Sequence, residues 1–125
     1  MNFSSLFLVF VGGGLGSVTR YGIGKGVQSF LPLNFPLATF LSNVVSCTVM
    51  AFVLFQFKEK PAFENVFKAF ILIGFCGGLS TFSAFSYETF QLLRQGDKGL
   101  AMFNIGLSIA MCLTIFYLFF IRENH

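Results

Sequence analysis

The stretch of this sequence that could do chemistry is GFCGGLSTFSAFSYE, residues 74–88, where hydroxyls alternate with phenylalanines behind a glycine pair. Its Ser and Thr hydroxyls belong to Ser80, Thr81, Ser83 and Ser86. Phe82 and Phe85 are three residues apart, so their rings share one face of a helix. A benzene ring has a positive edge, and ring edges beside neutral hydroxyl donors can solvate a small anion. Packing against lipid or other helices is the competing interpretation, because the chain contains 20 Phe.

A polar stripe crosses the apolar residues around position 43. Thr39, Asn43 and Ser46 recur at spacings of four and three residues, on one helix face, with Ser42 alongside. We interpret the hydroxyls as partners in interhelical hydrogen bonds. Asn43 differs because its amide has two donor hydrogens and an acceptor to satisfy at membrane depth. The stripe leaves open whether Asn43 contacts a permeating solute or another helix.

Two charged side chains lie near the ends of apolar segments. Arg20 has no acidic residue within a helical turn. Either its side chain extends to the membrane surface, or it raises the anion concentration at a pore mouth, and the sequence leaves both interpretations open. Glu88 lies close to the end of the third segment, and the sequence assigns it no role.

These residues lie in four apolar segments, at residues 3–21, 33–57, 69–93 and 99–121. A helix of roughly 20 apolar residues crosses a bilayer core of about 30 Å. The composition agrees, with 55% hydrophobic and only 10% charged residues. We therefore predict an all-α membrane protein with one four-helix domain over residues 1–125. The first segment lacks the N-terminal Lys or Arg of a signal peptide, so we expect a permanent helix.

The third segment is predicted to break near Gly77–Gly78. A glycine pair destabilises a helix, and the hydroxyls that follow compete for backbone hydrogen bonds. Irregular backbone at membrane depth persists only where it is buried in protein or lines a wet cavity. Broken membrane helices use freed carbonyls to hold a cation and exposed N–H groups to face an anion.

Small residues in the first segment predict close helix packing. Gly12 and Gly16 form one small-xxx-small pair, and Gly13 and Ser17 form a second. Such faces let helix backbones approach closely in lipid, so we favour packing over a role in lining a pore.

Several classes of function are excluded by composition. The net charge of +3 is small and scattered, which argues against nucleic-acid binding. His125 is the sole histidine and no catalytic constellation exists, so we predict that the chain is not an enzyme. The three cysteines, Cys47, Cys76 and Cys112, lie in apolar segments without CxxC spacing, and we interpret them as small hydrophobic residues.

The sequence resembles the Fluc (CrcB) family of fluoride channels over nearly its whole length. GGGLGSVTRY is similar to the family's first-span glycine motif, ending here at Arg20 and Tyr21. Asn43 falls at the family's second-span pore asparagine. GFCGGLSTFSAFS resembles the third-span signature.

The resemblance implies an antiparallel, dual-topology homodimer with two pores, which exports fluoride passively through the cell (inner) membrane. It implies that Phe82 and Phe85 contact the ion with their ring edges, that Asn43 donates its amide N–H, and that Ser83 and Ser108 form a hydroxyl track. Arg20 is counted with these pore residues. Backbone carbonyls of Gly77 and Ser80 from both subunits would hold a structural sodium ion. All the motifs occur in one chain, which favours a homodimer.

The chain departs from the family pattern at several positions. These are Ala84 for a common Thr, Asn104 for a frequent Tyr, Cys112 and Phe116 for hydroxyl residues, and Ala38 and Ser46 for glycines. The departures at 84, 112 and 116 shorten the polar track toward one end of the pore.

A small multidrug-type proton-coupled antiporter is the alternative, because it also has four spans in a chain of this length. Proton coupling needs a titratable group in the membrane, usually a carboxylate in the first span. Residues Phe3–Gly24 contain no Asp or Glu, which argues against this function. A structural subunit of a larger complex also remains open, but leaves the polar pattern unexplained.

The Lys and Arg residues divide evenly between the two membrane sides that four spans define. One side has Lys58, Lys60, Lys68 and Arg122, and the other has Arg20, Lys25, Arg94 and Lys98. Orientation follows the Lys/Arg bias of short loops. Four against four gives almost no bias, so we expect insertion in both orientations, as an antiparallel homodimer requires.

Overall fold

The computed structural model describes residues 2–31, 34–56 and 66–124. Within these ranges the chain forms helices and turns without a strand. Four helical stretches are long and apolar enough to cross a membrane, at Phe3–Phe30, Leu37–Gln56, Val66–Arg94 and Lys98–Glu123. The prediction of an all-α, multi-pass membrane protein is therefore confirmed.

The helix ends differ from the predicted boundaries where local capping decides them. Helix α1 (Phe3–Phe30) starts where the Asn2 side chain accepts a hydrogen bond from the Ser5 amide at 2.8 Å, and it runs well past residue 21. Helix α2 (Leu37–Gln56) begins only after Pro36. Helix α6 (Lys98–Glu123) follows a tight turn that Gly96 permits with its φ of 85°.

The third span is a series of short helical segments. It consists of α3 (Val66–Lys68), the π-helix η2 (Ala69–Cys76), α4 (Gly77–Leu79) and α5 (Phe82–Arg94). Ser80 and Thr81 between α4 and α5 have extended backbone, with φ −83°, ψ 157° and φ −154°, ψ 121°. The predicted break near Gly77–Gly78 is thus misplaced by a few residues, because both glycines are helical.

The glycines instead permit close contact between α1 and the third span. Gly12 and Gly16 are buried, and a Cβ added to Gly16 would lie 2.8 Å from the Leu79 nitrogen. A Cβ at Gly78 would overlap the Gly13 carbonyl oxygen. Side chains at these positions would force the two backbones apart, so the packing interpretation of the first-segment glycines is confirmed.

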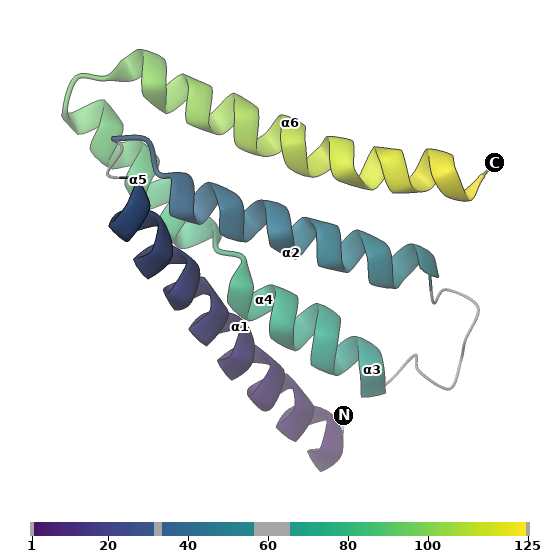
Figure 1. The fold of residues 1–125 in the computed structure, drawn as a ribbon. Helices are drawn as coiled ribbons and strands as arrows, with labels where there is room; N and C mark the ends of the chain where they lie inside the picture. The colour runs from purple at the N-terminus through teal and green to yellow at the C-terminus, as the bar shows by residue number, and fades with distance from the viewer. Residues whose placement is uncertain (1, 32–33, 57–65, 125) are drawn as a thin grey trace.

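The helices lie side by side, with α2 between α6 and the part of the third span from α3 to α4, whereas α5 reaches α6 directly (Figure 1). Both ends of the chain lie on the side where α2 ends and α3 begins, and the turn between α5 and α6 lies at the opposite end (Figure 1). This arrangement matches an even number of spans. Lys58 and Lys60, which enter the charge count, lie outside the described residues.

Candidate functional site

The interruption of the third span is held by a side chain from α2. Asn43 accepts a hydrogen bond from the Thr81 amide through Oδ1 at 2.9 Å, and its Nδ2 lies 3.5 Å from the Thr81 carbonyl oxygen. The Thr81 hydroxyl then caps α5 by accepting from the Ala84 amide at 3.1 Å. Asn43 and Thr81 thus satisfy backbone groups that a helix break would leave unpaired inside the membrane.

This capture releases two main-chain carbonyls. In an unbroken helix, the Thr81 amide would donate to Gly77 and the Ala84 amide to Ser80. Both amides donate to side-chain oxygens instead, of Asn43 and of Thr81 itself. The carbonyls of Gly77 and Ser80 are therefore without their usual helical donors, and Gly77 is exposed.

An open groove of about 300 Å³ lies beside the interruption. It is lined by Asn43, Cys47, Ser80, Thr81, Phe82, Phe85, Ser108, Ile109 and Cys112. The structure therefore brings together Asn43, Phe82, Phe85 and Ser108, four of the residues predicted for a pore. None of the described residues that line the groove is Asp, Glu, Lys or Arg, so its polar groups are neutral amides, hydroxyls and thiols.

The two predicted phenylalanines lie together on the wall of this groove. Their ring centroids are 6.0 Å apart, and the ring planes are inclined by 38°. The Phe82 side chain is 80% exposed in the single chain, whereas Phe85 is half-buried. An open, aromatic wall of this kind can present ring edges to whatever occupies the groove.

Ser83 is not part of the groove, although it was predicted to lie on a hydroxyl track beside the rings. Its side chain is exposed, and its Oγ lies 3.2 Å from the Thr81 hydroxyl oxygen. Position 83 is one residue from Phe82, and adjacent residues on a helix point in different directions. Ser83 therefore reaches the groove only through Thr81.

Ser108 is buried and belongs to a chain of hydrogen bonds that joins α6 to α5. Its hydroxyl donates to Asn104 Oδ1 at 3.3 Å, and Asn104 Nδ2 donates to the Thr89 hydroxyl at 2.9 Å. Thr89 in turn donates to the Phe85 carbonyl at 2.8 Å. The polar side chains of Asn104 and Ser108 on α6 thus have hydrogen-bond partners inside the protein.

Arg20 lies in a different cavity, of about 310 Å³, lined among others by Thr39, Ser42 and Glu88. Its Nε donates to the Gly78 carbonyl at 3.3 Å, so the half-buried side chain turns toward the third span. Glu88, distant in sequence, interacts with Thr39 and with the Arg20 charge. The arginine that has no acidic neighbour along its own helix therefore has one across the cavity.

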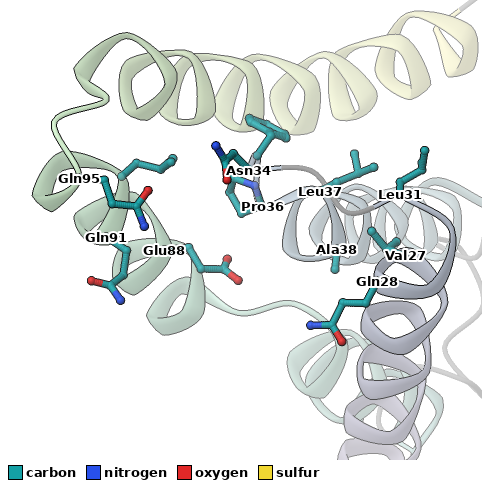
Figure 2. A pocket seen from close by; sticks show the side chains of 12 residues that line it. Val27, Gln28, Leu31, Asn34, Pro36, Leu37, Ala38, Glu88, Gln91 and Gln95 are labelled. Atoms are coloured by element: carbon teal, nitrogen blue, oxygen red, sulfur yellow. The ribbon is translucent and has the colours of Figure 1, made fainter.

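Glu88 also lines a third cavity, of about 340 Å³, at the end of the bundle. Figure 2 shows its side chain extending from α5 into the space opposite Ala38 and Gln28. The amide side chains of Gln91 and Gln95 lie on the same wall. One oxygen of the Glu88 carboxylate is buried without a hydrogen-bond partner among the described residues, as is the Ser42 hydroxyl.

Sequence reasoning missed the structural roles of Thr81, Thr89 and Asn104. The signal for Thr81 is present, because Thr is a favoured N-cap and Phe82 begins an amphipathic helix. Thr89 and Asn104 pair across two helices, and a single sequence gives no signal for that pairing.

Comparison with known proteins identifies the family. A family model described as CrcB-like protein, Camphor Resistance (CrcB), matches residues 7–120. The chain belongs to the CrcB family. A relative from Pyrococcus abyssi named Fluoride-specific ion channel FluC is 40% identical, over 97% of each chain. Another of the same name from Proteus mirabilis is 37% identical, over 92% of this chain and 94% of the relative.

These comparisons confirm the predicted resemblance. A third relative with that name, from Coxiella burnetii, is 36% identical over 88% of this chain and 90% of its own. The CrcB-family relatives are named as ion channels, and this CrcB-family chain is accordingly not an enzyme.

Proposed function

We propose that this CrcB-family chain is a fluoride-specific ion channel, with the groove beside the interruption as part of its path. The observation that carries the proposal is the meeting of Asn43, Phe82 and Phe85 around one uncharged groove. The names of the relatives support the choice of fluoride.

The groove offers hydrogen-bond donors to an anion without placing a formal charge beside it. Asn43 uses one amide hydrogen toward Thr81, which leaves its second for an ion in the groove. Ring edges of Phe82 and Phe85 supply weak positive potential on the other side. A channel must bind its ion strongly enough to admit it and weakly enough to release it, and neutral donors meet that condition.

We infer that transport is passive and carries fluoride out of the cytoplasm across the cell (inner) membrane. Coupling to protons needs a titratable carboxylate in the path. Neither a carboxylate nor an imidazole lines the groove among the described residues. Arg20 acts from its separate cavity by raising the anion concentration nearby, and Ser83 acts through Thr81.

The active form in this proposal is an antiparallel homodimer with two pores. Support comes from the open side of the groove, where Phe82 is 80% exposed in a single chain, and from the even Lys/Arg distribution. A partner subunit covering this side would close the groove into a pore. C-terminal reporter tags that show a single orientation of the unmodified chain would contradict this arrangement.

The dimer holds a structural sodium ion through main-chain oxygens in the same proposal. The carbonyls of Gly77 and Ser80 fit such a cation, because the amides that would occupy them donate to Asn43 and Thr81. Unwound backbone carbonyls are the groups that broken membrane helices use to bind Na⁺. When bound, the cation supplies positive charge that joins two interrupted helices.

The proposal is tested with the purified protein in liposomes loaded with potassium fluoride, with a potassium ionophore to balance charge. We expect a fluoride electrode to record release far above that from fluoride-loaded liposomes without protein. Chloride-loaded liposomes that contain the protein should release little chloride. Release that requires an imposed pH gradient would indicate a proton-coupled antiporter and would refute the channel.

A further inference from the structure

The hydroxyl of Ser108 is the one buried hydroxyl among the described residues that line the groove, and it has a single hydrogen to donate. In the structure this hydrogen goes to Asn104 Oδ1, away from the groove. The groove therefore meets the Ser108 lone pairs. Lone pairs repel an anion, so the direction of this hydrogen determines what Ser108 can do for fluoride.

That direction is fixed from the other end of the hydrogen-bond chain. Thr89 also has one hydrogen, and it donates that hydrogen to the Phe85 carbonyl. The Thr89 oxygen can then only accept, so Asn104 must turn its Nδ2 toward Thr89. Oδ1 is left facing Ser108, which must donate to it. The Phe85 carbonyl thus sets the polarity of Ser108 through Thr89 and Asn104, which we call the relay.

The relay has a second, equally complete arrangement. If the Asn104 amide rotates by half a turn, Thr89 donates to Oδ1 and Nδ2 donates to Ser108. The Ser108 hydrogen is then free for an anion in the groove. Both arrangements contain three hydrogen bonds, because the anion replaces the Phe85 carbonyl as the final acceptor. The Phe85 carbonyl still accepts its main-chain bond within α5. A hydrogen bond to an anion is stronger than a neutral one, so fluoride favours the second arrangement.

From this geometry we infer that Asn104 and Thr89 are positioning residues, whose reversal turns Ser108 from an acceptor into a donor when fluoride enters the groove. The inference rests on the proposed function. Asn104 is 1% exposed and Thr89 is 7% exposed, and neither belongs to the described lining of the groove. Asn104 can therefore act on the ion through Ser108, and Thr89 through Ser108 or through its bond to the Phe85 carbonyl, two routes that the removal of the Ser108 hydroxyl separates. The Asn at position 104 and the Thr at 89 supply the two bonds that make the relay reversible.

The relay predicts that Thr89→Val tightens fluoride binding. Without the Thr89 hydroxyl, the ion-free arrangement keeps only the bond from Ser108 to Asn104. The ion-bound arrangement keeps two bonds, from Asn104 to Ser108 and from Ser108 to the anion. Fluoride binding therefore adds one hydrogen bond in the variant, whereas it leaves the number unchanged in the native chain. We expect the half-saturating fluoride concentration to fall about three- to tenfold, the equivalent of one net hydrogen bond. Damage to packing alone would not tighten binding.

The experiment is a double-mutant cycle on the full chain in liposomes, measuring fluoride flux against fluoride concentration. The four proteins are the native chain, Thr89→Val, Ser108→Ala and the double variant. We expect Thr89→Val to lower the half-saturating concentration when Ser108 is present and to cause no further change in the Ser108→Ala background. Thr89→Ser should restore the native value. Thr48→Val is the matched control, because Thr48 makes the same type of bond, to the Val44 carbonyl at 2.8 Å, on an exposed site outside the groove.

Each outcome has one meaning. Absence of fluoride flux in the native chain overturns the proposed function and the relay together, and fluoride flux that does not saturate overturns the relay alone. Native flux with equal effects of Thr89→Val in both backgrounds, or with weakened binding, overturns the relay alone. If Thr89→Val does not assemble, the same cycle is run with Thr89→Ala, which deletes the same hydroxyl in a smaller side chain.

Discussion

The groove beside Phe82 and the cavity beside Arg20 are lined by residues from α2 and α5 in both cases, but their chemistry is opposite. The groove contains amide, hydroxyl, thiol and aromatic groups without a formal charge in its described lining. The cavity contains Arg20, Lys25 and Glu88. Thr39, Ser42 and Asn43 lie within one turn or so of each other on α2 and face these different sites. A shift of one residue along a helix therefore separates a neutral environment from a charged one.

The difference teaches how the chain can attract an anion without trapping it. A charge acts at long range and concentrates ions, but a buried charge binds them strongly. Neutral donors act only at contact. In the proposed channel, charges in one cavity and contact donors in the groove would separate the attraction of the anion from its passage, and variants of each site test that separation.

The largest effect is expected when the groove is given a charge. Asn43→Asp keeps an oxygen to accept the Thr81 amide hydrogen, so the interruption stays capped. A carboxylate about 4 Å from a passing anion costs roughly 4 kcal/mol at an effective dielectric constant of 20, or about a thousandfold in flux. Fluoride efflux from liposomes measures the loss, and gel filtration checks assembly. Native flux in Asn43→Asp would mean that ions pass elsewhere.

A smaller loss is expected when the groove keeps its shape but loses its ring edges. Phe82→Ile and Phe85→Ile retain bulk and hydrophobicity, and we expect each to reduce fluoride flux by about a hundredfold, because removing one preorganised positive group from an anion costs roughly 3 kcal/mol. Phe90→Ile is the matched control, because Phe90 is exposed on α5 and outside the groove. Unchanged flux in both groove variants would show that the rings face lipid.

A smaller loss of fluoride flux, of about tenfold, is expected from closing the proposed main-chain cation site. Gly77→Val places branched carbons beside the released carbonyl, and a cost of about 1–2 kcal/mol is usual for such a change. Ser80→Ala should leave the site intact, because the proposed ligand there is the carbonyl oxygen. Sodium-dependent thermal stability of the two variants measures the difference. Equal sodium dependence in both variants would place the cation elsewhere or remove it from the proposal.

Much of this architecture could be predicted from the sequence because its causes are local. Apolar length alone gives four spans, and spacing alone places Phe82 and Phe85 on one face. The break was misplaced because its cause is not local. Gly77 and Gly78 have weak helix propensity, yet Gly78 is helical where it packs against Gly13. The chain leaves the helix at Thr81, where Asn43 from another span captures an amide.

The same limit applies to the polar residues of the candidate site. Thr89 and Asn104 lie on two helices joined by a turn, and Arg20 and Glu88 lie in the first and third spans. Their pairing depends on how helices rotate against one another, which follows from contacts such as those of Gly12 and Gly16 with the third span. Residue type identified which side chains needed partners, but only packing chose the partners.

The smallest effect is expected from the charged cavity. Arg20→Gln removes a positive charge that lies outside the groove, so we expect fluoride flux to fall about threefold at an ionic strength of about 10 mM. The Debye length shrinks from about 30 Å at 10 mM to about 3 Å at 1 M, so the variant and the native chain should converge at high salt. Arg20→Lys keeps the charge and should keep the native salt dependence. Arg94→Gln removes an exposed positive charge that lines neither the groove nor this cavity, and it controls for net charge.

If Arg20→Gln lowers flux equally at both salt concentrations, the contribution of Arg20 is its hydrogen bond to the Gly78 carbonyl, which stabilises the third span. The groove and the Arg20 cavity would then differ in structure, but attraction and passage of the anion would not be divided between them.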